Sequence, residues 1–114
     1  MRNIVRHWKA ENIKPFFNYF ISQDGDVINS KGEIMKPWLH IGRGNKPYRK
    51  IKLTIGNKRK AYRVARLVLT VHNRPPKKGE EANHDNRITT DDRHCNLYWC
   101  TKSENQRHWR NNIK

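Results

Sequence analysis

Residues 48–64, YRKIKLTIGNKRKAYRV, alternate between two kinds of side chain and so constrain the fold more than any other segment. In the first half, one side carries Tyr48, Lys50, Lys52 and Thr54, and the other carries Arg49, Ile51, Leu53 and Ile55. A period of two residues is typical of a β-strand with one buried face. A Gly-Asn pair at 56–57 indicates a turn. The segment therefore predicts a two-stranded ribbon with one apolar face and one densely cationic face.

The residues before this ribbon predict further short strands. Tyr19–Ile21 is aromatic and β-branched, Val27–Ile28 resumes the pattern, and Ile34–Met35 follows. Turn signals that contain glycine separate these runs at 24–25 and 31–32. We therefore expect a short antiparallel meander. Only 34% of the chain is hydrophobic, so the core must be thin, and aromatic side chains would supply much of it.

After the ribbon the spacing of apolar residues changes. Residues spaced three and four apart are Val64, Leu67, Val68 and Val71. This spacing predicts a helix over about 65–72, and the two prolines at 75–76 end it, because proline does not continue a helix.

The last third predicts a strand, a long loop, a second strand and a helix. The strands are expected near 81–84 and 97–100. Thr101 and Glu104 have the spacing of a capping box, in which each residue satisfies a backbone N–H of the other, so the helix is expected to begin there.

The charge of the chain indicates a polyanionic partner. Lys and Arg number 25 against 10 Asp and Glu, a net charge of +15. Such an excess repels itself unless a polyanion neutralises it, so nucleic acid is the first expectation and an anionic membrane surface the second. The longest apolar run, Leu67–Leu69, is far short of the roughly 20 residues of a membrane span. Without a secretory signal, Cys95 and Cys100 are interpreted as thiols of a cytoplasmic protein.

Several polar residues of the last third stand at fixed offsets. They are Asn83-His84, Asn96-Leu97 with Trp99, Thr101, and Glu104-Asn105. His84 and Asn96 are 12 residues apart, and Asn96 and Asn105 are 9 apart. This pattern resembles the NH-x(11)-NL-x-W-x-T-x-x-EN motif of HNH endonucleases, in particular the phage and intron-encoded homing type. The resemblance covers about residues 64–108, and the basic strands before it resemble, more loosely, the N-terminal sheet modules that accompany this family.

The resemblance implies a ββα-metal nuclease and a role for each matching residue. His84 matches the general base, and an ordinary imidazole can accept a proton from water near neutral pH. Asn96 matches the residue whose side-chain oxygen holds that imidazole in one tautomer. Asn83 and Asn105 match the metal ligands, and their oxygen atoms suit Mg²⁺ or Mn²⁺.

Three departures from the family pattern affect these expectations. Ala65 stands where many relatives have histidine, and the loop after the base, DNRIT, has no glycine. Asn83 stands where some relatives have aspartate. Since Mg²⁺ favours carboxylates, an aspartate of the same loop is an alternative ligand; the candidates are Asp85, Asp91 and Asp92.

The two cysteines leave a second metal site open as an alternative. Cys95 and Cys100 form C-x(4)-C, with His84 and His94 nearby in the sequence. Zinc uses such ligands, although the paired C-x(2)-C knuckles of related structural zinc sites are absent.

The cationic loop and ribbon are the expected DNA contact. The candidates are Arg43, Lys46, Tyr48, Arg49, Lys50, Lys52, Lys58, Arg59, Lys60, Arg63 and Arg66. A two-stranded ribbon fits the major groove of B-form DNA. Its cations would mainly bind phosphates, so affinity should fall steeply with salt.

We therefore expect an α+β protein. An N-terminal antiparallel β-sheet module, residues 1–63, would precede a ββα-metal (HNH) motif in 64–114, the two forming one compact unit. The expected function is metal-dependent cleavage of double-stranded DNA, by a nick or a double-strand break, with the oligomeric state left open. Two alternatives remain: a non-catalytic basic DNA-binding protein that keeps the motif as a scaffold, and an RNA-binding or ribosome-associated protein.

Overall fold

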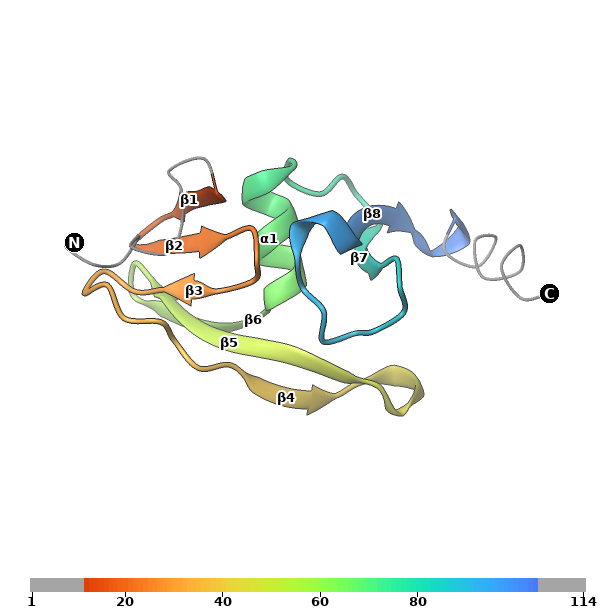
Figure 1. Cartoon of the computed structure of the whole chain (residues 1–114), viewed down its shortest axis with the longest axis horizontal. Helices are drawn as coiled ribbons and strands as arrows, with labels where there is room; N and C mark the ends of the chain where they lie inside the picture. The colour runs from red at the N-terminus through yellow and green to blue at the C-terminus, as the bar shows by residue number, and fades with distance from the viewer. Residues whose placement is uncertain (1–11, 105–114) are drawn as a thin grey trace.

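The computed structural model describes residues 12–104, and three small antiparallel sheets surround one helix in that range (Figure 1). The strands are β1 (Ile13–Phe16), β2 (Tyr19–Ser22), β3 (Val27–Ile28), β4 (Trp38–Ile41), β5 (Pro47–Ile55), β6 (Lys58–Arg63), β7 (Glu80–His84) and β8 (Leu97–Thr101). The helix is α1 (Val64–His72), and two short 3-10 turns are η2 (Arg43–Asn45) and η3 (His94–Asn96). The expected α+β class is confirmed.

The first sheet has the order β1-β2-β3 and confirms the strands expected around 19–21 and 27–28. The third expected run forms only a single bridge, in which Ile34 pairs with Ile28. Strand β1 was not predicted, because Lys14 and Pro15 interrupt its apolar pattern. Its pairing with β2 runs from Ile13 opposite Ser22 to Phe16 opposite Tyr19.

The second sheet has the order β4-β5-β6 and contains the predicted ribbon. Strands β5 and β6 pair from Lys50 opposite Arg63 to Ile55 opposite Lys58, which confirms the turn at 56–57. Gly56 has a φ of 64°, a left-handed conformation that glycine adopts without strain. Strand β4 adds a third strand at the other edge of β5 and was not predicted.

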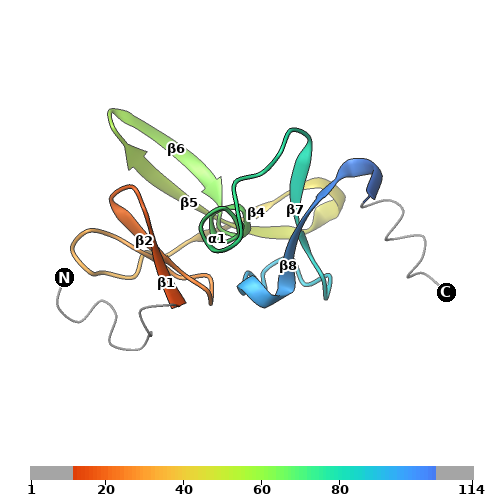
Figure 2. The same cartoon turned by 90° about the horizontal axis from the view of Figure 1, so that it is seen from above.

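Helix α1 confirms the change of period after residue 63 and lies between the sheets, as Figure 2 shows from above. The fully buried core includes Ile21 and Val27 from the first sheet, Ile51 and Leu53 from the second, and Val64, Leu67, Val68 and Leu69 from the helix. Leu97 and Trp99 of β8 complete this cluster. Helix α1 therefore holds the three sheets in fixed positions around itself.

The third sheet pairs β7 with β8, as expected for the two strands of the C-terminal motif. The predicted capping box is also present: Glu104 Oε1 accepts from the backbone N–H of Thr101 (2.8 Å), and Thr101 Oγ1 accepts from the backbone N–H of Glu104 (3.2 Å). Residues 102–104 are helical and end the described range.

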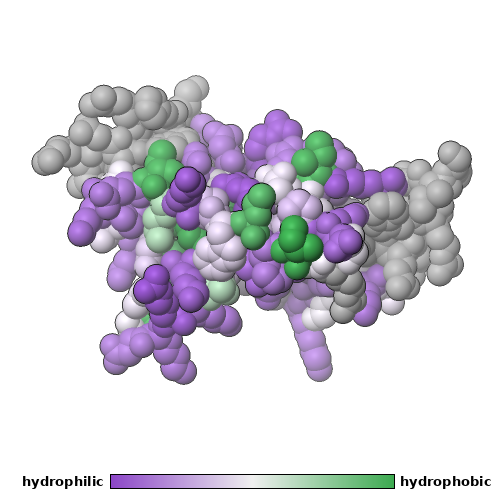
Figure 3. Space-filling view, turned by 90° about the horizontal axis from the view of Figure 1, so that it is seen from below, coloured by the Kyte–Doolittle hydropathy of each residue, from purple (hydrophilic) through white to green (hydrophobic). Residues whose placement is uncertain are grey.

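Hydrophilic side chains cover most of the described surface seen from the β4 side, with separate hydrophobic patches between them (Figure 3). The large apolar side chains exposed on β4 are Trp38, Leu39 and Ile41. Among the described residues, α1 is far too short to cross a bilayer, and no other helix qualifies as a membrane span.

Candidate active site

His84 lies at the end of β7, opposite Leu97 of β8, and its ring is held by a buried carboxylate. The distance from His84 Nε2 to Asp92 Oδ1 is 2.8 Å. The two side chains are 4% and 2% exposed, respectively. The contact with Asp92 uses Nε2, so Nδ1 is the ring nitrogen left to accept a proton from a water molecule.

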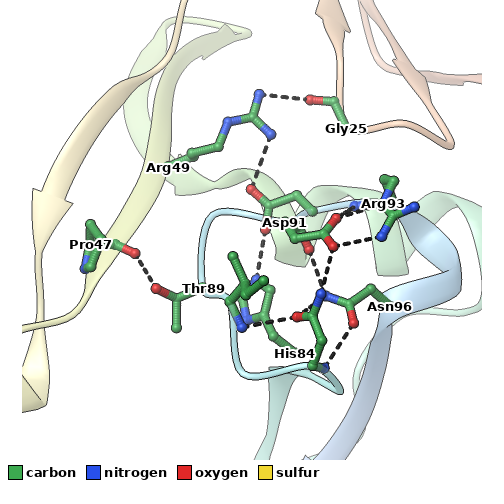
Figure 4. A network of polar contacts seen from close by, with 11 residues as sticks. Gly25, Pro47, Arg49, His84, Thr89, Asp91, Arg93 and Asn96 are labelled. Atoms are coloured by element: carbon green, nitrogen blue, oxygen red, sulfur yellow. Dashed lines mark hydrogen bonds and ion pairs between the residues drawn. The ribbon is translucent and has the colours of Figure 1, made fainter.

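Arg49 of β5 binds the other oxygen of the same carboxylate (Figure 4). Its Nη1 is 3.2 Å from Asp92 Oδ2, and its Nη2 donates to the backbone oxygen of Gly25 (3.1 Å). A Cβ atom at Gly25 would lie 3.1 Å from the backbone oxygen of Asp92, so the turn after β2 can approach this closely only because residue 25 is glycine. One guanidinium thus joins the second sheet to the first sheet and to the loop between β7 and β8.

The start of β5 can receive that loop because one of its edges is open. Strand β4 pairs with β5 from Pro47, whereas β6 pairs only from Lys50 onward. The loop lies against the open edge, where Thr89 Oγ1 donates to the backbone oxygen of Pro47 (2.5 Å). The ring of Tyr48 is 6.3 Å from that of His84.

Asn96 binds the loop and not the imidazole. Its Oδ1 accepts from the backbone N–H of Asn86 (2.9 Å), and its Nδ2 donates to Asn86 Oδ1 and to the backbone oxygen of Asp91 (both 2.9 Å). These bonds close the loop that has no glycine. The expectation that the Asn96 oxygen fixes the tautomer of His84 is therefore corrected: Asp92 makes that contact.

Asn83 presents one oxygen atom suited to a hard cation. Its Nδ2 donates to the backbone oxygen of Glu81 and to Sγ of Cys100, both at 3.0 Å. Because both hydrogens of the amide are used inside the protein, Oδ1 is the atom left to act as a ligand. The donor type fits Mg²⁺ or Mn²⁺. The second expected ligand, Asn105, lies outside the described residues.

The aspartates considered as alternative ligands are mostly engaged elsewhere. Asp92 binds His84 and Arg49, as described above. Asp91 binds Arg93 through two contacts of 2.7 Å, and this guanidinium holds the pKa of Asp91 well below its usual range. Asp85, by contrast, is exposed at the start of the loop.

The cysteines occupy different environments. Cys95 is exposed on η3, whereas Cys100 is buried beneath Asn83, and burial raises the pKa of its thiol. In the part of the chain that the structure describes, no three His, Cys, Asp or Glu side chains are grouped so that they could hold a metal ion.

The expected DNA-contacting residues do not share one surface. The outer face of the second sheet carries Lys50, Lys52, Arg59 and Arg63, whereas Lys58 and Lys60 project from the far end of β6 and Arg66 is exposed on α1. The guanidinium of Arg63 lies 3.9 Å above the ring of Tyr48. Lys46 is half-buried beside η2, and the side chain of Arg43 lies outside the description. The guanidinium of Arg49 is used inside the protein, by Asp92 and by the backbone oxygen of Gly25.

The sequence did not predict that Asp92 would contact His84 or that Cys100 would contact Asn83. Nothing in the pair Asp91-Asp92 indicates which carboxylate turns inward. The position of Arg49 follows from the alternation of β5, which puts it on the same side as Ile51 and Leu53.

Comparisons with known proteins agree with the motif. No protein-family model matches the chain. The chain is 32% identical over 101 residues to an uncharacterized HNH endonuclease, L247, of Acanthamoeba polyphaga mimivirus, and the match covers 89% of this chain and 25% of that protein. It is also similar to a solved structure titled "DNA binding and cleavage by the HNH homing endonuclease I-HmuI", with a TM-score of 0.65, 26% identity, and coverage of 85% of this chain and 55% of that one. The chain thus spans a quarter of one relative's length and about half of the other's. The resemblance to HNH endonucleases that the motif indicated is confirmed in sequence and in structure.

Proposed function

We propose that this chain cleaves phosphodiester bonds of double-stranded DNA with the help of Mg²⁺ or Mn²⁺, in the manner of homing-type HNH endonucleases. The observation that carries the proposal is the ring of His84, held at the end of β7 by Asp92, with Asn83 as the preceding residue of the same strand. Asp92 engages Nε2 of His84 and leaves Nδ1 for a water molecule, and the Asn83 amide keeps its oxygen for a cation. The two similar proteins, an uncharacterized HNH endonuclease and an HNH homing endonuclease whose structure is described as DNA binding and cleavage, support the same reaction.

In this proposal each side chain has a defined task. Nδ1 of His84 accepts a proton from a water molecule, which makes that water a better nucleophile. Oδ1 of Asn83 binds the cation, together with Asn105. A divalent cation bound there would stabilise negative charge on the phosphate and on the leaving oxygen. Asn96 contributes indirectly, by closing the loop that carries Asp92.

The outer face of the second sheet is the proposed DNA contact. Lys50 and Arg63 are directly opposite each other on β5 and β6, with Lys52 and Arg59 farther along the same face. Pro47 and Arg49 of the same sheet also bind the loop between β7 and β8, which carries Thr89 and Asp92. A phosphate backbone bound on this face is therefore held by the element that also positions His84.

One observation favours the non-catalytic alternative. Asp91 and Asp92, in the loop between β7 and β8, each form a salt bridge with an arginine. If the neutral amides hold the cation too weakly, the chain would bind DNA without cutting it. The two functions are separated by measuring cleavage and binding on the same preparations.

The test compares the parent with two histidine variants, His84→Ala and His94→Ala. Supercoiled plasmid is incubated with each protein in Mg²⁺, in Mn²⁺ and in EDTA, and binding to a labelled duplex is measured in parallel. We expect the parent and His94→Ala to nick the plasmid only with metal. His84→Ala should lose at least about 100-fold in rate, the usual contribution of a positioned base, with unchanged binding. Equal cleavage by all three proteins would reject the proposal, and binding without cleavage would support the non-catalytic alternative.

A competition experiment separates DNA from RNA as the partner. A labelled duplex DNA is displaced by unlabelled duplex DNA or by structured RNA at one fixed salt concentration, because salt alone changes such affinities greatly. We expect the duplex DNA to compete better. Stronger competition by RNA would support the RNA-binding alternative.

A further inference from the structure

We propose that Asp92 is the positioning residue of His84 and that Arg49 fixes the orientation of Asp92, so that the base acts through Nδ1. The consequence for catalysis rests on the proposed function, whereas the assignment of the ring nitrogens does not. The proposal concerns two residues that are not part of the HNH motif: Asp92 in the loop between β7 and β8, and Arg49 in β5.

The chemistry of the three groups assigns the hydrogen on the imidazole. Arg49 remains charged, and its Nη1 lies 3.2 Å from Asp92 Oδ2. An ionised carboxylate only accepts hydrogen bonds, so the 2.8 Å contact at Asp92 Oδ1 requires a donor on the ring. Nε2 of His84 therefore carries the hydrogen, and the lone pair of the neutral ring is on Nδ1.

The carboxylate is fixed on several sides, as a positioning residue must be. Asp92 is 2% exposed and both of its oxygens are bound. The backbone of the loop around it is tied to two other sheets, since His94 N donates to Gln23 O (2.7 Å) and Thr89 Oγ1 donates to Pro47 O. Gly25 packs directly against Asp92. The ring of His84 thus has one well-defined partner, held in place by all three sheets.

Replacing Asp92 with asparagine separates the role of Arg49 from that of the acceptor. The amide has one oxygen and one NH₂ in place of two equivalent oxygens. Arg49 only donates, so it attracts the oxygen and turns the NH₂ toward Nε2 of His84. That NH₂ needs an acceptor, which Nε2 provides only when the hydrogen moves to Nδ1. Asp92→Asn is therefore expected to reverse the tautomer and remove the base, although its size is unchanged.

A second substitution should restore the original arrangement. In the double variant Arg49→Met/Asp92→Asn, no guanidinium competes for the amide oxygen. The oxygen can then turn to His84 and accept from Nε2, as the carboxylate does in the parent. A merely structural role for Asp92 predicts that the double variant cleaves DNA no faster than Asp92→Asn, whereas the positioning role predicts partial recovery.

The test reads the ring directly by NMR of the ¹⁵N-labelled, metal-free full chain at alkaline pH, about pH 9. Long-range ¹H–¹⁵N spectra identify which nitrogen of His84 carries hydrogen. We expect Nε2–H in the parent, Nδ1–H in Asp92→Asn and Nε2–H again in the double variant. Hydrogen on Nδ1 in the parent, alone or together with Nε2, would overturn the proposal, as would an unchanged ring in Asp92→Asn. The parent spectrum decides even if a variant fails to fold.

Cleavage measurements then test the catalytic consequence. The kcat of Asp92→Asn should fall about 10²–10⁴-fold, the contribution of a positioned base, with DNA affinity unchanged. The kcat of the double variant should be at least about tenfold higher than that of Asp92→Asn. A fall in kcat without a change of tautomer would overturn the positioning role. If the parent does not cleave DNA, the proposed function fails while the tautomer result stands by itself, so the two failures are distinguishable.

Discussion

The most quantitative prediction concerns the stability of the Arg49→Met variant. Loss of the guanidinium leaves the carboxylate of Asp92, 2% exposed, with only the imidazole of His84 as a partner. Removing one member of a buried ion pair typically costs about 3–5 kcal/mol. Arg49 itself is 21% exposed, so we take about 2–3 kcal/mol for the pair. The lost hydrogen bond to Gly25 adds about 1 kcal/mol.

The expected destabilisation is therefore about 3–4 kcal/mol, a large part of the roughly 5–15 kcal/mol that stabilises a small domain. Urea unfolding measures it. With a slope of about 1–3 kcal/mol per molar, the midpoint should fall by at least about 1 M at unchanged slope. The matched control is Arg59→Met, which removes an exposed arginine of the neighbouring strand and should change stability by less than about 0.5 kcal/mol.

The double variant Arg49→Met/Asp92→Asn tests the cause of the effect. Once the carboxylate is neutral, the loss of Arg49 no longer leaves a buried charge unpaired. We expect the double variant to be more stable than Arg49→Met alone by more than about 1 kcal/mol. If Arg49→Met unfolds at the same urea concentration as Arg59→Met, the inward role assigned to Arg49 is refuted.

Three further predictions follow from other contacts. Asn96→Ala should cost about 2–3 kcal/mol of unfolding free energy in urea, because its three bonds close the loop; an unchanged midpoint would contradict this. Lys52→Ala should weaken DNA binding and reduce the slope of log Kd against log salt by about one, whereas Lys31→Ala, in the turn after β3, should leave the slope unchanged. Hydrogen bonds from Arg74 hold the pKa of Glu80 at about 2, below its ordinary 4.5. Its ionised form therefore contributes stability above about pH 4.5 that is lost as pH falls through about 2, and Glu80→Gln should remove this dependence in acid-unfolding curves.

The predictability of the fold depended on how each strand is buried. Strands β5 and β6 follow from their sequence because half of β5 faces the core, which imposes a period of two residues. Strand β4 is exposed along its whole length, so it carries no such period and is held by backbone pairing to β5. Strand β1 contains Lys14-Pro15 for the same reason, since both residues are exposed.

For the site, the sequence indicated which residues take part but not which contacts they make. The fixed offsets of Asn83, His84 and Asn96 made them candidate site residues, and the structure places all three in one local unit formed by β7, the loop and β8. Their contacts were harder to predict, because these depend on which side chains of the loop turn inward. Asp92 contacts both His84 and Arg49, and Arg49 lies 43 residues away in the sequence, so no local pattern around Asp92 indicates its counter-charge.

A structure of the full chain bound to a DNA duplex in Mn²⁺, with anomalous diffraction to locate the metal, would show whether cation, phosphate and His84 meet at one site. We expect a manganese peak about 2.1 Å from Oδ1 of Asn83, in contact with a backbone phosphate, and a water within hydrogen-bond distance of Nδ1 of His84. Well-ordered DNA on the protein with no metal at Asn83, or with every phosphate remote from His84, would contradict this expectation.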